Sequence, residues 1–337
     1  MKVNIHKWIS RIPELPVIRQ FIHWSKHYTL PGFQGVSIYA TLTFIIKELK
    51  NNDINIRASA MAYDFFLALF PSMIFLFTLS AYLPKSWDFV TVMETSLNSV
   101  LPDQAQDYLW KNIVGSLRPK ASGNFLSIGF VLAIFFASNG ILTMMRGFDK
   151  VYHSSFRKRG FLERQSVALV LTILFGILLM LSVVVVIMGN KILLWLFSFL
   201  HLTFMQNVSG TILKYLILIF LFYLTIDLIY RLGPAFRKPM KSYSPGTIFA
   251  TATSLLTSIL FGYFIDNFSS YHKVYGTISA LIITLIWIRL NVLILLLGFE
   301  LNAGIIVNRD MMNEMEYQGT NQTAQLNEVE TIPVGNE

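Results

Sequence analysis

Six segments of this chain are long and apolar enough to cross a lipid bilayer as helices. They cover roughly residues 60–83, 124–145, 166–189, 210–231, 244–266 and 277–300. A spanning helix needs about 20 mostly apolar residues. The composition agrees, because 54% of the residues are hydrophobic and only 14% are charged, whereas a soluble domain carries about 25% charged residues. We therefore predict an all-α, polytopic integral membrane protein with six transmembrane helices.

The positive charges lie mostly on one side of these segments. Nineteen Lys and Arg residues fall in the N-terminal arm, in the loops after the second and fourth spans and in the C-terminal tail, and seven fall on the other side. Because cytoplasmic loops are enriched in Lys and Arg, we predict that both termini are cytoplasmic. This topology accounts for most of the net charge of +8, so we expect no nucleic-acid partner.

The chain divides into three parts. Residues 1–57 form a cytoplasmic or interfacial arm, residues 58–307 form the transmembrane domain, and residues 308–337 form a polar, acidic cytoplasmic tail that we predict to be disordered. The outer loop, residues 84–123, contains "PDQAQDYLWKNIVGSL", whose spacing predicts amphipathic helix over the outer mouth. Because the first long apolar run begins near residue 58, we predict no cleaved signal peptide.

A further amphipathic helix is predicted within the arm, at "VSIYATLTFIIKEL". This segment is too short to span the bilayer. Its apolar face and the flanking Lys47 and Lys50 suit a helix that lies on the membrane surface. A cytosolic helix that packs under the bundle is the alternative.

The fifth segment has a small residue at every fourth position. These residues are Gly246, Ala250, Ser254, Ser258 and Gly262. Small side chains at this spacing let a neighbouring helix approach closely. We interpret the stripe as a helix-packing seam, with a sliding surface in a moving transporter as the alternative.

The sixth segment carries polar residues on two faces. One face holds Thr284, Asn291, Gly298 and Asn302. Arg289 and Glu300 are eleven residues apart and share nearly the opposite face. A helix that is polar on two faces should be surrounded by protein or water, so we place this segment near the bundle centre. Our candidates for a substrate path are Arg289, Glu300, Asn291 and Asn302.

Of the charges in the chain, Arg289 should cost the most free energy to place in the membrane, because it lies about twelve residues into the sixth span, close to the midplane. A charge at the centre of a span costs at least about 2.5–3.5 kcal/mol, so such residues are candidate functional groups. A guanidinium fits an anionic substrate such as a lipid phosphate well. A structural ion pair is the alternative, and we favour the functional interpretation.

Three carboxylates lie near the predicted cytoplasmic ends of the spans, and several arginines lie close to them in sequence. We predict a cytoplasmic-side ion network with the candidate members Asp64, Asp227, Arg231, Arg57 and Arg146. Glu300 is the third carboxylate at this depth. Asp227 and Arg231 are four residues apart and can pair along their own helix.

Motifs for common enzyme chemistry are absent from the sequence. The chain contains no cysteine, which excludes disulfides, thiolate metal sites and cysteine nucleophiles. It has no Walker-type phosphate loop, zinc helix motif or serine nucleophile elbow. We therefore assign no catalytic residue, no metal site and no cofactor, and we predict that the protein is not an enzyme.

Four stretches resemble the YihY/virulence factor BrkB family of bacterial inner-membrane proteins. They are "RASAMAYDFFLALFPSMIF", "FFASNGILTMMRGFDKVYH", "YRLGP" and "YGTISALIITLIWIRLNVLILLLGFELNAG", and the resemblance covers roughly residues 36–307. It implies six spans, cytoplasmic termini and a place in the bacterial cytoplasmic membrane. This chain departs from the family pattern at Asp64, where a neutral residue such as tyrosine is more common, and at Phe299, where alanine is common.

The resemblance also bears on function. The family has carried the label ribonuclease BN, which is regarded as a misassignment, and we predict that this chain is not a ribonuclease. Buried charges and the polar sixth span lead us to expect a transporter or lipid translocator for an anionic amphiphilic envelope substrate. The expected partners are membrane lipids, including anionic headgroups. The alternative is a non-transporting membrane scaffold or envelope-assembly partner.

Overall fold

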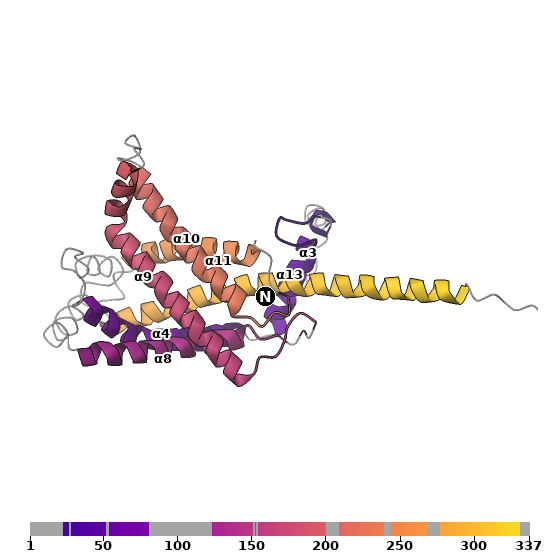
Figure 1. Ribbon diagram of the computed structural model, residues 1–337, viewed down its shortest axis with the longest axis horizontal. Coiled ribbons are helices and arrows are strands. Elements are labelled where there is room, and N and C mark those ends of the chain that lie inside the picture. The colour runs from indigo at the N-terminus through magenta and orange to yellow at the C-terminus, as the bar shows by residue number, and fades with distance from the viewer. Residues whose placement is uncertain are drawn as a thin grey trace, which may run out of the picture.

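The computed structural model describes residues 23–26, 28–51, 54–80, 123–150, 152, 154–199, 209–238, 244–267 and 277–330 (Figure 1). Its helices are α3 (Ile38–Asn51), α4 (Ile54–Ser80), α8 (Gly123–Gly147), α9 (Phe161–Phe199), α10 (Ser209–Leu232), α11 (Pro245–Asn267) and α13 (Thr277–Glu330). Within these residues the extended structure is limited to an isolated antiparallel bridge between Phe156 and Phe236. The predicted all-α fold is therefore confirmed.

Five of the six predicted spans correspond to helices long and apolar enough to cross a membrane. These stretches are Ser127–Gly147, Phe161–Val186, Ile212–Leu232, Pro245–Ile265 and Leu281–Met315. The first predicted span, residues 60–83, begins within α4 and runs past the last described residue of that helix. The predicted outer-loop helices at 84–123 lie outside the described residues. Six spans and the orientation of the termini remain predictions.

Hydroxyl side chains inside the apolar helices bond to the backbone one turn earlier. Thr172 donates to Ala168 O at 2.7 Å, and Ser182 donates to Leu178 O at 2.9 Å. This local bond satisfies a hydroxyl that has no water to bond with in hydrocarbon. Ser72, which follows Pro71 within α4, does the same with the carbonyl of Ala68.

The helices pack in a closed circuit. α4 packs on α8 and α13, α11 packs on α13 and α10, and α9 packs on α10 and α8. Figure 1 shows α4 and α8 running alongside each other, and α9 and α10 alongside each other at a steep angle to that pair. α13 is therefore one member of the circuit, between α4 and α11, and it also meets α10, because the Tyr230 hydroxyl donates to Leu295 O at 2.6 Å. The position of the sixth span at the bundle centre stays a prediction.

The best-packed part of the molecule lies at one end of this circuit, where α4 and α11 begin and α8 and α10 end. Fully buried side chains there include Met61, Met144, Tyr230 and Leu296. The ring of Phe299 lies 4.4 Å from that of Phe148, measured between ring centroids. Phe299, the large residue at a position where the resembled family commonly has alanine, thus fills the centre of this core.

The tail is helical where the sequence predicts disorder, because α13 continues without a break to Glu330. Figure 1 shows this part of α13 projecting beyond the other helices. Its base is held by side chains: Arg309 Nη1 donates to Gln34 Oε1 at 2.6 Å, and Ser155 donates to Asp310 Oδ2 at 2.7 Å. A helix that is already nucleated and anchored extends at low cost. The prediction of disorder is therefore wrong for residues 308–330.

The predicted amphipathic helix of the arm is α3, and it packs on α13. Thr41 and Phe44 are buried on its inner face. A Cβ atom added to Gly304 of α13 would lie 3.0 Å from Phe44 Cδ1, so the two helices approach closely at that point. One face of α3 thus packs on α13, and both predicted positions, on the membrane surface and under the bundle, stay predictions.

Candidate functional site

Four charged side chains from four elements meet at the well-packed end of the molecule. They are Glu48 of α3, Arg57 of α4, Lys150 after α8 and Glu300 of α13. Lys150 Nζ donates to Glu48 Oε2 at 2.6 Å and to Glu300 Oε1 at 2.7 Å. Arg57 Nη2 donates to the same Glu300 oxygen at 3.3 Å. We call these four residues the buried ion network.

The network is buried as a unit. The side chains of Glu300, Lys150 and Glu48 are 0%, 3% and 7% exposed, and that of Arg57 is 23% exposed. Transferring a charge from water to a protein interior costs several kcal/mol per ion unless partners compensate it. Two positive and two negative groups balance here, so each member is tolerated because the others are present.

Neighbouring groups fix the network in place. The hydroxyl of Tyr152 donates to Glu48 Oε1 at 2.9 Å, and Arg57 Nη1 donates to the carbonyl of Gly147 at 2.6 Å. Burial and the hydrogen bond to Glu48 raise the pKa of Tyr152 to about 12, so its hydroxyl stays protonated and remains a donor at neutral pH. The network therefore also ties the C-terminal end of α8 to the start of α4.

One oxygen of the network has no protein partner among the described residues. Glu300 Oε2 is buried and accepts no hydrogen bond from these residues. Arg57 Nε is also buried and donates no hydrogen bond to them. Buried polar atoms are rarely left unpaired, and each exception needs a physical explanation such as an ordered water or a functional role. Among the described residues, no group of three or more His, Asp or Glu is placed to hold a metal ion.

Arg289 lies apart from the network but on the same side of α13. Its Nε donates to the hydroxyl of Ser59 in α4 at 3.1 Å, and the side chain is exposed. Both Arg289 and Glu300 thus contact α4, which agrees with the helix face that they share by spacing. At a rise of about 1.5 Å per residue, Arg289 lies about 16 Å from Glu300 along α13, whereas Ser59 lies only about 3 Å from Arg57 along α4. The guanidinium therefore extends toward the network end.

The two asparagines of the predicted substrate path have other partners. Asn302 accepts from the backbone N–H of Gly246 at 2.8 Å and donates to Ser244 at 2.8 Å, so it fastens the start of α11 to α13. Asn291 donates to the carbonyl of Trp287 on its own helix at 3.0 Å. The structure does not bring the four predicted path residues together, and a path through them stays a prediction.

The small-residue seam meets α13 along its first half. Gly246, Ala250 and Ser254 are buried, and a Cβ atom on Gly246 would lie 2.0 Å from the carbonyl oxygen of Gly298. Ser258 is half-buried, and a Cβ atom on Gly262 would meet nothing within 4 Å. A four-residue step turns an α-helix by about 40° beyond a full turn. The stripe therefore rotates away from α13 along its length.

The predicted cytoplasmic-side ion network is divided among separate contacts. Asp64 accepts a hydrogen bond from the hydroxyl of Thr143 in α8. Asp227 and Arg231 form the i,i+4 ion pair that their spacing predicts, at 2.5 Å. Arg57 belongs to the buried ion network described above, and Arg146 is exposed at the end of α8. The structure does not bring these five residues together.

Two loops at the same end are joined by backbone hydrogen bonds. Arg157 N–H donates to Ala235 O at 2.8 Å, and Arg237 N–H donates to Ser155 O at 2.9 Å. The side chain of Arg159 then caps the end of α10 through three carbonyls. Its Nη1 donates to Gly233 O at 2.7 Å, and its Nη2 donates to Leu232 O at 2.9 Å and Pro234 O at 3.1 Å. These carbonyls belong to the "YRLGP" stretch and would otherwise lack partners at the helix end.

Loss of this cap should weaken the protein measurably. We expect Arg159→Ala to lower the free energy of unfolding by about 1–3 kcal/mol, because hydrogen bonds from a charged donor to three carbonyls are lost. The matched control is Arg157→Ala, which removes only an exposed ion pair with Glu163, and such solvent-screened pairs contribute little to stability. Thermal unfolding in detergent measures both variants. Equal losses in the two would contradict the assigned cap.

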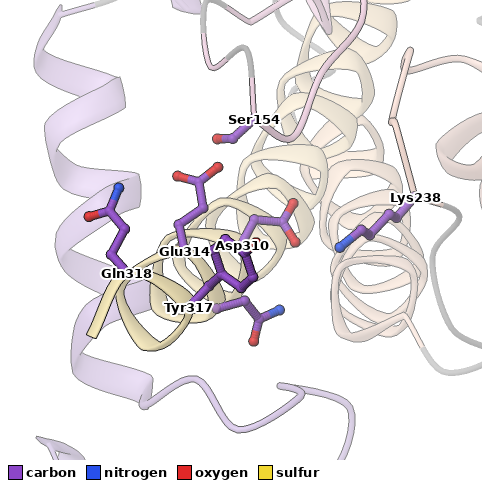
Figure 2. A pocket seen from close by; sticks show the side chains of 7 residues that line it. Ser154, Lys238, Asp310, Glu314, Tyr317 and Gln318 are labelled. Atoms are coloured by element: carbon purple, nitrogen blue, oxygen red, sulfur yellow. The ribbon is translucent and has the colours of Figure 1, made fainter. Parts of the chain in front are cut away.

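Two hollows lie in the described surface. One, of about 270 Å³, is lined by Ser154, Lys238, Asp310, Asn313, Glu314, Tyr317 and Gln318. Figure 2 shows Glu314 and Tyr317 projecting from α13 on one side of this hollow and Lys238 on the other. The other, of about 390 Å³, is an apolar groove between α10 and α11. Asp310 in the polar hollow is already bonded to Ser155 and Arg309.

Long apolar helices in a closed circuit, with charges concentrated at one end, define a multi-pass helical membrane protein. The chain belongs to the virulence factor BrkB family, whose model matches residues 45–323. The resemblance found in the sequence is therefore confirmed.

Curated relatives agree with this assignment. The chain is similar to the ribonuclease-like protein YfkH of Bacillus subtilis, with 26% identity over 261 residues, which cover 77% of this chain and 93% of the relative. It is also similar to a UPF0761 membrane protein of Psychromonas ingrahamii, with 27% identity over 270 residues, which cover 79% and 87% of the two chains. A UPF0761 membrane protein of Pseudoalteromonas translucida matches at 37% over 78 residues, 23% of this chain and 26% of the relative. No solved structure matches this chain significantly.

Proposed function

We propose that this protein translocates an anionic amphiphilic lipid across the bacterial cytoplasmic membrane, with both termini in the cytoplasm. The observation that carries the proposal is the exposed guanidinium of Arg289, which arises inside a span and is held by Ser59 of a second helix. A charge in this position is costly unless it meets water or an opposite charge. A lipid phosphate supplies that opposite charge, and a guanidinium binds phosphate through paired hydrogen bonds.

The surroundings of Arg289 support a moving site. Its contact to Ser59 uses Nε and leaves the two terminal nitrogens on an exposed side chain. The α11–α13 contact is made by glycines on both helices, and small residues permit close, smooth packing. The buried ion network lies at the end of the predicted sixth span, on the same helix, and can hold that end of the bundle closed. The proposal includes no enzyme activity. The ribonuclease-like name belongs to the Bacillus relative and is not transferred to this protein.

The test is a lipid-scrambling assay in vesicles that contain the purified protein and a fluorescent phosphatidylglycerol. A membrane-impermeant quencher reports how fast labelled lipid leaves the inner leaflet. We expect Arg289→Ala to slow this exchange about tenfold or more, because a charged hydrogen-bond partner of the phosphate is lost. Arg289→Lys should retain part of the rate, since it keeps the charge but loses the paired geometry.

Two controls make the result decisive. Arg157→Ala removes an exposed arginine that pairs with Glu163, and it should leave the rate unchanged. A fluorescent phosphatidylcholine should exchange more slowly than phosphatidylglycerol with the wild-type protein. Exchange no faster than in protein-free vesicles would overturn the proposal and favour the non-transporting scaffold, which predicts a stable co-purifying partner.

A further inference from the structure

Helix α3 is fixed to the molecule by one face only. Thr41, Phe44 and Glu48 are buried on this face. Phe44 meets Gly304, and Glu48 is tied through Lys150 to Glu300. These contacts fix the rotation of α3 about its own axis, so the directions of its remaining side chains are set.

The exposed surface of α3 divides into an apolar and a polar flank. The apolar flank consists of Tyr39, Leu42, Ile46 and Leu49, whose exposed fractions lie between 36% and 52%. The polar flank holds the exposed Thr43 and Lys47. At about 100° per residue, the buried face, the apolar flank and the polar flank point roughly 100–150° apart. The helix thus has three faces, and the buried face is the one that packs on α13.

The segment before α3 continues the same chemistry. The exposed rings of Trp24 and Tyr28 stack with centroids 4.6 Å apart. Lys26 Nζ lies 5.1 Å from the centroid of the Tyr39 ring, at the start of the apolar flank. Tryptophan, tyrosine and lysine are the residues enriched where a membrane meets water, because each joins an apolar body to a polar tip.

The position of α3 places these groups at the membrane boundary. Val36 packs with Ile305, Phe44 meets Gly304, and Glu48 reaches Glu300 through Lys150, so the contacts from Val36 to Glu48 cover only six residues of α13. α3 therefore crosses α13, as Figure 1 also shows. A helix that crosses a spanning helix near the end of its span runs along the plane of the membrane surface.

We infer that α3, together with residues 23–26 and Tyr28, forms an interfacial anchor seated in an anionic leaflet. The apolar flank of Leu42 and Ile46 enters the hydrocarbon, and Lys26 and Lys47 meet lipid phosphates. An amphipathic helix with basic residues beside its apolar face binds membranes in this way. The inference does not depend on the proposed function, because an anchor is needed equally by a translocator and by a scaffold.

The absence of cysteine from the chain allows a direct test. Four single-cysteine variants, Leu42→Cys, Ile46→Cys, Thr43→Cys and Lys47→Cys, each take one spin label in the full-length protein. The label's collision rates with oxygen and with a water-soluble nickel chelate report its depth in phosphatidylglycerol-containing vesicles. We expect the labels at 42 and 46 to collide mainly with oxygen, and those at 43 and 47 to collide mainly with the chelate.

Reference positions calibrate the two extremes. Ile259→Cys labels an exposed position on the α11 span, and Lys158→Cys labels an exposed loop position. Strong chelate collisions at 42 and 46, equal to those at 158, would overturn the anchor. Labels at 42 and 46 that are shielded from both reagents would also overturn it, in favour of a protein partner or a second copy. A depth that does not decrease when all anionic lipid is replaced by phosphatidylcholine would overturn the role of the lysines.

Discussion

Replacing Glu300 by alanine is expected to lower the free energy of unfolding by about 3–5 kcal/mol, the cost of leaving buried opposite charges without their partner. Lys150 would keep only Glu48, and Arg57 would keep only the carbonyl of Gly147. The cavity left by a fully buried side chain adds to the loss. Equilibrium unfolding in mixed detergent micelles measures the change.

Two further variants separate charge from shape in this experiment. Glu300→Gln keeps the side-chain volume and one acceptor for Lys150, so we expect a smaller loss than with alanine. Glu163→Ala removes a surface carboxylate that pairs with Arg157 and, at 3.7 Å, with Arg159, and it is the control, with an expected loss much smaller than that of Glu300→Ala. Similar small losses in Glu300→Ala and Glu163→Ala would contradict the view that the four charges stabilise one another.

The spans could be predicted from the sequence because each depends on its own residues. A run of about 20 apolar residues must be helical in hydrocarbon whatever lies beside it. The Asp227–Arg231 pair was predictable for the same reason, since both residues lie on one helix, four residues apart. Family membership was predictable from short motifs that lie within these spans.

The membership of the buried ion network was not predictable in this way. Lys150 meets Glu48 and Glu300 across 102 and 150 residues of sequence. Counting charges by loop places Lys150 among the basic residues of a cytoplasmic loop, and nothing local distinguishes it from its neighbours. Glu48 gives one local signal, because it lies on the same face of its amphipathic helix as Phe44. The positions of Arg57 and Glu300 relative to the spans predicted both on the cytoplasmic side, but they did not predict that the two residues pair.

Close contact between α11 and α13 gives the second large effect. We expect Gly246→Ala to lower the free energy of unfolding by about 3 kcal/mol, at the upper end of the cost of overpacking. The new methyl group would lie 2.0 Å from the carbonyl oxygen of Gly298 and 2.6 Å from the Asn302 side chain. The first of these is a backbone atom, which cannot turn aside as a flexible side chain can. The two helices must separate, and the Asn302 bonds to Gly246 and Ser244 are then lost as well.

The same stripe supplies a matched control for this prediction. Gly262→Ala makes the identical substitution on the same helix, where the added methyl group meets nothing within 4 Å. Alanine favours an α-helix over glycine by about 1 kcal/mol, so this variant should be as stable as the wild type or slightly more stable. Size-exclusion profiles and unfolding in mixed micelles compare the two. If both substitutions changed the free energy of unfolding equally, helix propensity would account for the change. The close contact between Gly246 and Gly298 would then have no measurable effect. Opposite signs would show that the seam depends on which of its glycines face α13.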